Sequence, residues 1–139
     1  MGGFPSIARQ AAVLAGIVSL AACGPSCDCL VPASAAVTGH VKTAAGSDVA
    51  GATVFGYAAP PSDTCSVGAE SGLTTSDATG QYSLGLVYGM TLDSACVFVK
   101  VRPPQGSSLR DTVVGPIRLA FRYSAPTDRV VVNVMLDSL

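Results

Sequence analysis

Cysteine is the residue type that could carry the most chemistry in this chain of 139 residues, which has five cysteines and one histidine. The first cysteine, Cys23, ends a run of one leucine and two alanines. Arg9 and the amino terminus put positive charge at the start, and about ten apolar residues follow at positions 11–20. A membrane-spanning helix needs roughly twenty apolar residues. The stretch therefore predicts a secretory signal, with a short buried helix as the alternative interpretation.

Residues 20–23 (LAAC) resemble the lipobox of bacterial lipoproteins, in which a leucine and two small residues precede a cysteine. The resemblance implies that residues 1–22 are a signal peptide cut between Ala22 and Cys23. It also implies that the Cys23 sulfur receives a diacylglyceryl group and that the new amine is acylated, as with palmitate. Gly24 stands where an aspartate retains enterobacterial lipoproteins in the inner membrane. The resemblance thus implies an exported protein held in a lipid bilayer through acylated Cys23, the outer membrane in a Gram-negative organism.

The four remaining cysteines predict disulfide bonds, because an exported chain meets an oxidising compartment. They allow three pairings and are Cys27, Cys29, Cys65 and Cys96. Cys27 and Cys29 are too close to pair comfortably with each other, so either each reaches into the domain or Cys65 pairs with Cys96. The alternative is that Cys27 and Cys29 bind a metal ion or a small molecule. Because paired metal-ligand spacings are lacking, we predict no metal site and no cofactor.

Residues 23–36 are small and contain prolines, which predicts a flexible spacer after the lipidated cysteine. From residue 37 the apolar residues alternate with polar ones, which is typical of half-buried strands. Asp77 and Gly80 predict a tight turn between two of these strands. We predict an all-β domain over residues 37–139, a Greek-key β-sandwich of seven strands at residues 37–42, 51–57, 72–75, 82–86, 95–102, 117–123 and 130–136.

Part of this pattern resembles the carboxypeptidase regulatory-like domain over about fifty residues, from 37 to 86. The matching positions are Val37-x-Gly39-x-Val41, Gly46, Val49-Ala50-Gly51-Ala52-x-Val54 and Thr75-x-Asp77-x-x-Gly80-x-Tyr82-x-Leu84. The resemblance implies a prealbumin-like β-sandwich. It also implies an accessory module, since none of the shared motif residues is catalytic in that family.

The sequence offers little for catalysis or for nucleic acid. Charged residues are only 12% of the chain and the net charge is −1, so no basic surplus is present to hold a phosphate backbone. The single histidine, His40, lies on the first predicted strand without a nucleophile motif, and we predict that the chain is not an enzyme. A self-formed amide bond between Lys42 and Asn133 is disfavoured, because alternation points both side chains away from the core.

Three aromatic residues form a candidate binding face. Phe55, Tyr57 and Phe98 are predicted to point outward from two strands that could be neighbours, and exposed rings can anchor a protein or a sugar. The sequence therefore predicts a membrane-anchored envelope lipoprotein that acts as a non-catalytic binding or scaffolding module for a protein or carbohydrate partner. The alternative function is a lipoprotein that binds a small molecule or a metal ion through Cys27 and Cys29.

Overall fold

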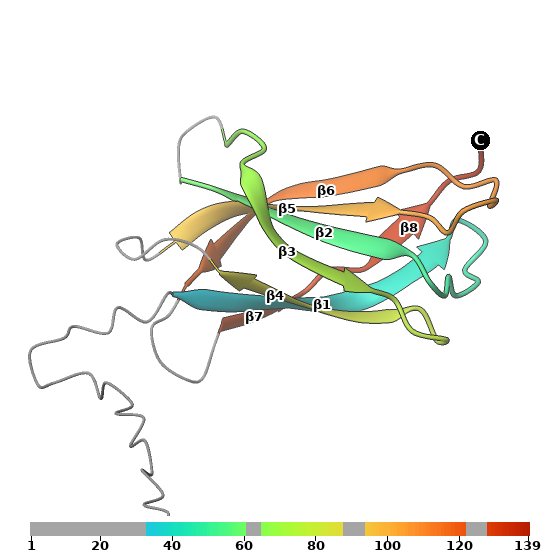
Figure 1. Cartoon of the computed structure of the whole chain (residues 1–139), viewed down its shortest axis with the longest axis horizontal. Helices are drawn as coiled ribbons and strands as arrows, with labels where there is room; N and C mark the ends of the chain where they lie inside the picture. Colours follow the sequence, from blue (N-terminus) through green and yellow to red (C-terminus); the bar gives the residue numbers. More distant parts are fainter. Residues whose placement is uncertain (1–32, 61–64, 88–93, 122–127) are drawn as a thin grey trace, which may run out of the picture.

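The computed structural model describes residues 33–60, 65–87, 94–121 and 128–139, which form two β-sheets packed face to face (Figure 1). The first sheet has the order β4-β1-β7, with β8 also paired to β1; its strands are β1 (Ser34–Thr43), β4 (Gln81–Val87), β7 (Asp128–Val131) and β8 (Val134–Leu136). The second has the order β3-β2-β5-β6; its strands are β2 (Thr53–Ala59), β3 (Ala69–Thr75), β5 (Ser94–Arg102) and β6 (Thr112–Ala120). The predicted all-β sandwich is confirmed, with eight strands rather than seven.

Several strand boundaries differ from the prediction, and those of β1 and β6 have a clear reason. β1 begins at Ser34, inside the predicted spacer, because residues 34–36 pair with the end of β4 and with the start of β7. β6 begins at Thr112 rather than at residue 117, because its first residues pair with the end of β5. The described part of the chain contains no helix long and apolar enough to cross a membrane.

The core lies between the two sheets and follows the predicted alternation. Along β4, Tyr82, Leu84 and Leu86 are buried while the residues between them are exposed. The inward residues of β2 and β5 meet them from the other sheet. The largest fully buried side chains of this core are Leu84, Leu86, Leu136, Val37, Val41, Val54, Val97, Val99, Val101 and Val134.

The predicted last strand is divided into β7 and β8. Both pair in parallel with β1 in a single register, Thr38 opposite Val131 and Val41 opposite Val134. Between them the backbone N–H of His40 donates to the side-chain Oδ1 of Asn133, at 3.0 Å. A side-chain amide thus replaces a backbone carbonyl in the ladder, which is why the strand is interrupted at this point.

A tyrosine of β4 reaches across β1 to this interruption. Tyr82 pairs directly with Gly39, and its hydroxyl donates a hydrogen bond of 2.6 Å to the carbonyl of Val132. A Cβ atom on Gly39 would overlap that carbonyl and would lie 3.1 Å from the Tyr82 ring. Because glycine has no Cβ, the ring can pass over β1 and the last strand can approach closely.

Ser76 directly follows β3 and joins two connections of the chain. β3 ends at the end of the sandwich opposite to the start of β1 (Figure 1). Ser76 is the one buried polar residue among the described residues, and its hydroxyl accepts from the N–H of Ala52 and donates to the carbonyl of Val49. These two bonds fasten the β1–β2 connection to the β3–β4 connection. A buried hydroxyl that is fully hydrogen-bonded in this way fixes the position of both turns.

We predict that Gly39→Ala destabilises the protein strongly, by about 2 to 4 kcal/mol, because the added methyl group collides with the Val132 carbonyl. Gly85→Ala is the matched control: Gly85 is on the adjacent strand, and a Cβ there meets nothing within 4 Å. Its free energy of unfolding should stay within about 0.5 kcal/mol of the parent. Urea denaturation of both variants measures the difference, and equal stabilities would contradict the proposed close approach.

Tyr82 also predicts a loss of stability in alkali, since burial raises the pKa of its hydroxyl from 10.0 to about 12. A group whose pKa is higher in the folded state than in the unfolded state stabilises the fold. This stabilisation is complete at a pH below the unfolded-state pKa and is lost as the pH rises through the folded-state pKa. The free energy of unfolding should therefore fall between pH 10 and about 12. An ultraviolet titration should show one tyrosine that ionises late, and Tyr82→Phe should abolish that step. If the late step persists in Tyr82→Phe, the assignment is wrong.

Candidate functional site

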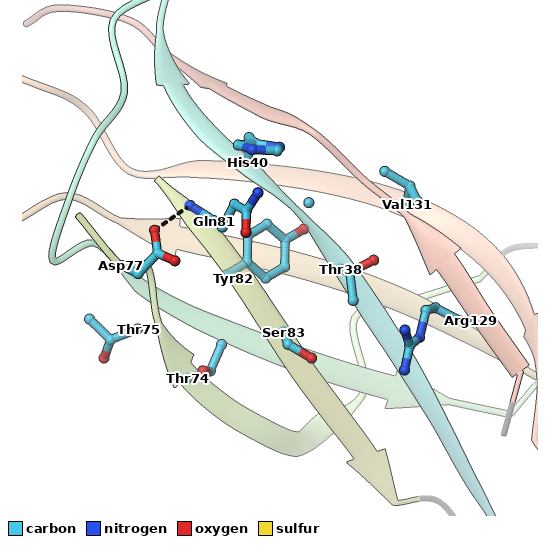
Figure 2. A pocket seen from close by; sticks show the side chains of 11 residues that line it. Thr38, His40, Thr74, Thr75, Asp77, Gln81, Tyr82, Ser83, Arg129 and Val131 are labelled. Carbon is cyan, nitrogen blue, oxygen red and sulfur yellow. Dashed lines mark hydrogen bonds between the residues drawn. The ribbon is translucent and has the colours of Figure 1, made fainter. Parts of the chain in front are cut away.

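A groove runs along the outer face of the first sheet and encloses about 660 Å³ (Figure 2). Alternation explains its composition, because the residues of β1 and β4 that flank the inward core positions must point outward. Its floor and sides carry mostly polar side chains from β1, β4 and β7, with the end of β3 and the following turn along one side. The residues named below as groove residues are Thr38, His40, Gln81, Ser83, Arg129, Val131, Thr74, Thr75 and Asp77.

Most of the polar side chains of the groove have no partner within the described residues. The hydroxyls of Thr38 and Ser83 and the amide of Gln81 take part in no hydrogen bond there, and the Arg129 guanidinium makes no ion pair. Some other cations of the described residues are paired; Lys42 lies 3.3 Å from Asp48, for example. The groove therefore presents hydrogen-bonding groups and one positive charge that remain available to a ligand.

Asp77 lies at the end of the groove nearest the β3–β4 turn. Its Oδ1 accepts a hydrogen bond of 3.0 Å from the backbone N–H of Gln81 (Figure 2). It also accepts from the backbone N–H of Thr79, at 2.8 Å, and from the Thr79 hydroxyl. These bonds hold the pKa of the Asp77 carboxyl below its ordinary value of 3.8, and the bond from the Thr79 hydroxyl has the largest effect. Gly80 completes the turn with a φ of +73°. Asp77 is thus ionised at neutral pH, and its Oδ2 takes part in no hydrogen bond to the described residues.

A smaller cavity of about 270 Å³ adjoins the groove at His40, which lines both. Lys42 and Asn133 line it too, on the outer face of the sheet, as the alternation predicts. The Lys42 ammonium pairs with Asp48, and Asn133 is held by the backbone of His40. Neither group is buried in the apolar surroundings that would favour an amide bond between them.

The three predicted aromatic residues lie on neighbouring strands, but they do not form an open platform. Tyr57 and Phe98 are paired across β2 and β5, and the rings of Phe55 and Tyr57 are 6.5 Å apart. Phe98 is only 7% exposed, because Gly115 of β6 lies against its ring, while the other two are half-buried. The Arg102 guanidinium covers the Phe55 ring at 5.2 Å from its centroid. The prediction of three exposed rings is therefore wrong for Phe98.

Of the pairings left open by the sequence, the structure has Cys65 bonded to Cys96, with 5.8 Å between their Cα atoms. The disulfide closes a loop of 31 residues, a constraint worth about 3 to 4 kcal/mol in the chain-entropy treatment. It lies on the outer face of the second sheet, opposite to the groove. Cys23, Cys27 and Cys29, and the predicted cleavage position at Ala22, lie outside the described residues.

Sequence reasoning did not identify the groove. Its residues come from positions 38–40, 74–83 and 129–131, and the motif positions among them, such as Thr75 and Asp77, were interpreted only as parts of strands and a turn. The one available signal was the set of polar residues that alternate with apolar ones along each strand. That signal marks a solvent-facing side but says nothing of which strands are neighbours.

Comparison with solved structures shows the fold in proteins of distant sequence. The chain is similar to a chlorocatechol 1,2-dioxygenase from Pseudomonas putida, with 13% identity and a TM-score of 0.50, over 76% of this chain and 61% of that one. It thus spans less than two thirds of that enzyme. A second similar structure is the dioxygenase domain of a dioxygenase carbohydrate-binding protein fusion from the cellulolytic bacterium Streptomyces sp. SirexAA-E, with 17% identity and a TM-score of 0.48, over 81% and 84% of the two chains. No family model and no curated protein matches the sequence.

The first comparison corrects the prediction that the chain is not an enzyme. That prediction relied on the accessory role of the domains that the sequence resembles, whereas the sandwich is shared with a protein named as a dioxygenase. The fold is therefore compatible with catalysis. Because one fold hosts many activities, the function has to be argued from the residues of the site.

The described residues can be tested against the chemistry of oxygen activation. That chemistry uses a metal or an organic cofactor, and non-haem iron sites commonly combine two histidines with a carboxylate. Within the four described ranges, no group of three or more histidine, cysteine or acidic residues lies close enough to hold a metal ion. The whole chain has one histidine. These residues do not fit a metal centre of that kind.

Proposed function

We propose that this protein is an exported lipoprotein that displays a ligand-binding β-sandwich in the cell envelope. Acylated Cys23 is its attachment to the bilayer, and the groove on the outer face of the first sheet is its binding site for a carbohydrate or a protein. The observation that carries the binding role is the groove itself, where polar side chains without partners surround a concave space of about 660 Å³. Ligand pockets in proteins commonly enclose about 300 to 1,000 Å³.

The attachment is supported by the sequence before the sandwich. The lipobox-like run at residues 20–23 follows an apolar stretch of signal-peptide length, and β1 begins at Ser34. The chain from Cys23 to Ser34 can extend to at most about 40 Å. A sandwich tethered in this way stays close to the bilayer, with the start of β1 as its attached end.

The orientation of the groove suits this arrangement. It follows β1, from Arg129, which pairs with Ala36 near the attached end, to Asp77, beside the distant turn. A ligand lying in it would extend away from the bilayer. The outer face of the second sheet, which carries the Cys65–Cys96 disulfide, is on the other side of the sandwich. The disulfide therefore leaves the groove unobstructed.

We predict that Cys23→Ala abolishes acylation and releases the protein from the membrane. The parent should incorporate radiolabelled palmitate and sediment with envelope membranes, because several acyl chains anchor a protein nearly irreversibly. The variant should carry no label and should shift to the soluble fraction. Metabolic labelling and membrane fractionation measure both effects.

Cys29→Ala is the matched control, since it removes a nearby thiol that the lipobox does not contain. It should keep both the label and the membrane location. Labelling that survives in Cys23→Ala would overturn the proposed attachment, and an intact mass of the parent without acyl groups would do the same.

A further inference from the structure

We infer that the groove binds an acidic oligosaccharide, with a carboxylate of the sugar chain seated at Arg129 and neutral hydroxyls toward Asp77. This inference rests on the proposed binding role of the groove and gives that role a ligand class. Three features carry it: the kind of polar group present, an arginine in the groove without an ion pair, and the spacing of the two charged ends.

The first feature is that only side chains can bond to a ligand on the floor of the groove. The backbone of β1 is paired with β4 on one side and with β7 and β8 on the other. A peptide that binds by adding a strand needs a free backbone edge, which this floor lacks. The groups available instead are the hydroxyls of Thr38, Ser83 and Thr74 and the amide of Gln81. Each of these side chains both donates and accepts, as sugar hydroxyls do.

The second feature is Arg129, an exposed cation without an ion pair among the described residues. Elsewhere in the described chain, Lys100 and Arg102 share Asp111, at 3.4 and 3.8 Å. A guanidinium can bind a carboxylate through two parallel hydrogen bonds, which gives both affinity and orientation. One such group, in a chain with a net charge of −1, suits a ligand with a few carboxylates rather than a nucleic acid.

The third feature is the placement of charge along β1. Arg129 pairs with Ala36, and Gln81, whose N–H bonds to Asp77, pairs with His40. Four residues of strand separate these positions, or roughly 13 Å. This distance exceeds one sugar ring, so the groove fits a short oligomer. The Asp77 carboxylate repels an acidic group but accepts hydroxyls at Oδ2, which fixes the direction of the chain.

The test is isothermal titration of the full-length chain with two probes that differ only at their carboxyl groups, tetragalacturonic acid and its methyl ester, which is uncharged. We expect the acid to bind at least ten-fold more tightly than the ester. Arg129→Gln should reduce the affinity for the acid to that for the ester, because the glutamine keeps a donor but loses the charge. Arg110→Gln is the matched control: Arg110 is an exposed arginine outside the groove, in the connection after β5, and its replacement should leave both affinities unchanged.

The outcomes separate this inference from the proposed function. Equal binding of acid and ester, unaffected by Arg129→Gln, overturns the ligand class but keeps a sugar-binding groove. If neither probe binds, a photoreactive amino acid replaces Ser83 and cross-linking is carried out in cells. A cross-link to an envelope protein then overturns the oligosaccharide and retains the binding role, and no cross-link overturns both. Thermal melting of Arg129→Gln checks that the exposed substitution leaves the fold intact.

Discussion

The hydrogen bond from the Tyr82 hydroxyl to the Val132 carbonyl joins three strands that are distant in sequence. It exists because Gly39 leaves room for the ring to cross β1. It holds the carbonyl away from the β1 ladder, so the side chain of Asn133 supplies the missing acceptor to His40. The same interaction thereby sets the register of β7, which carries Arg129 and Val131 to the rim of the groove. The position of Arg129 in the groove thus depends on the buried hydrogen bond between Tyr82 and Val132.

The two ends of the sandwich are secured by different means. At the end distant from the start of β1, Ser76 binds the two connections together and Asp77 closes the adjoining turn through three hydrogen bonds to its Oδ1. On the second sheet the Cys65–Cys96 disulfide fastens the chain that follows β2 to the start of β5. A small core benefits from such supplements, since a domain of this size buries a modest share of its surface. The groove meets the first fastening at Asp77 and lies away from the disulfide, and its side chains on β1 and β7 belong to neither.

The similarity to a chlorocatechol 1,2-dioxygenase concerns the fold alone, which is a weak guide to function here. One fold can host many unrelated activities. What distinguishes this chain is its choice of outward residues: hydroxyls, one amide and one arginine line the groove, and no set of metal ligands is found among the described residues. These groups are the observations on which the proposed ligand class depends.

The sequence by itself determined the local features. The alternation of residues fixes which side chains face the core, as at Leu84 and Val134, and Asp77 with Gly80 is sufficient for a tight turn. The lipobox-like run is equally local and needs no fold. Only the tertiary structure decided that β1 pairs in parallel with β7 and β8, that Gly115 covers Phe98 and that the groove residues converge. Strand order and pairing arise from long-range packing and loop closure, which a period of two along the chain does not specify.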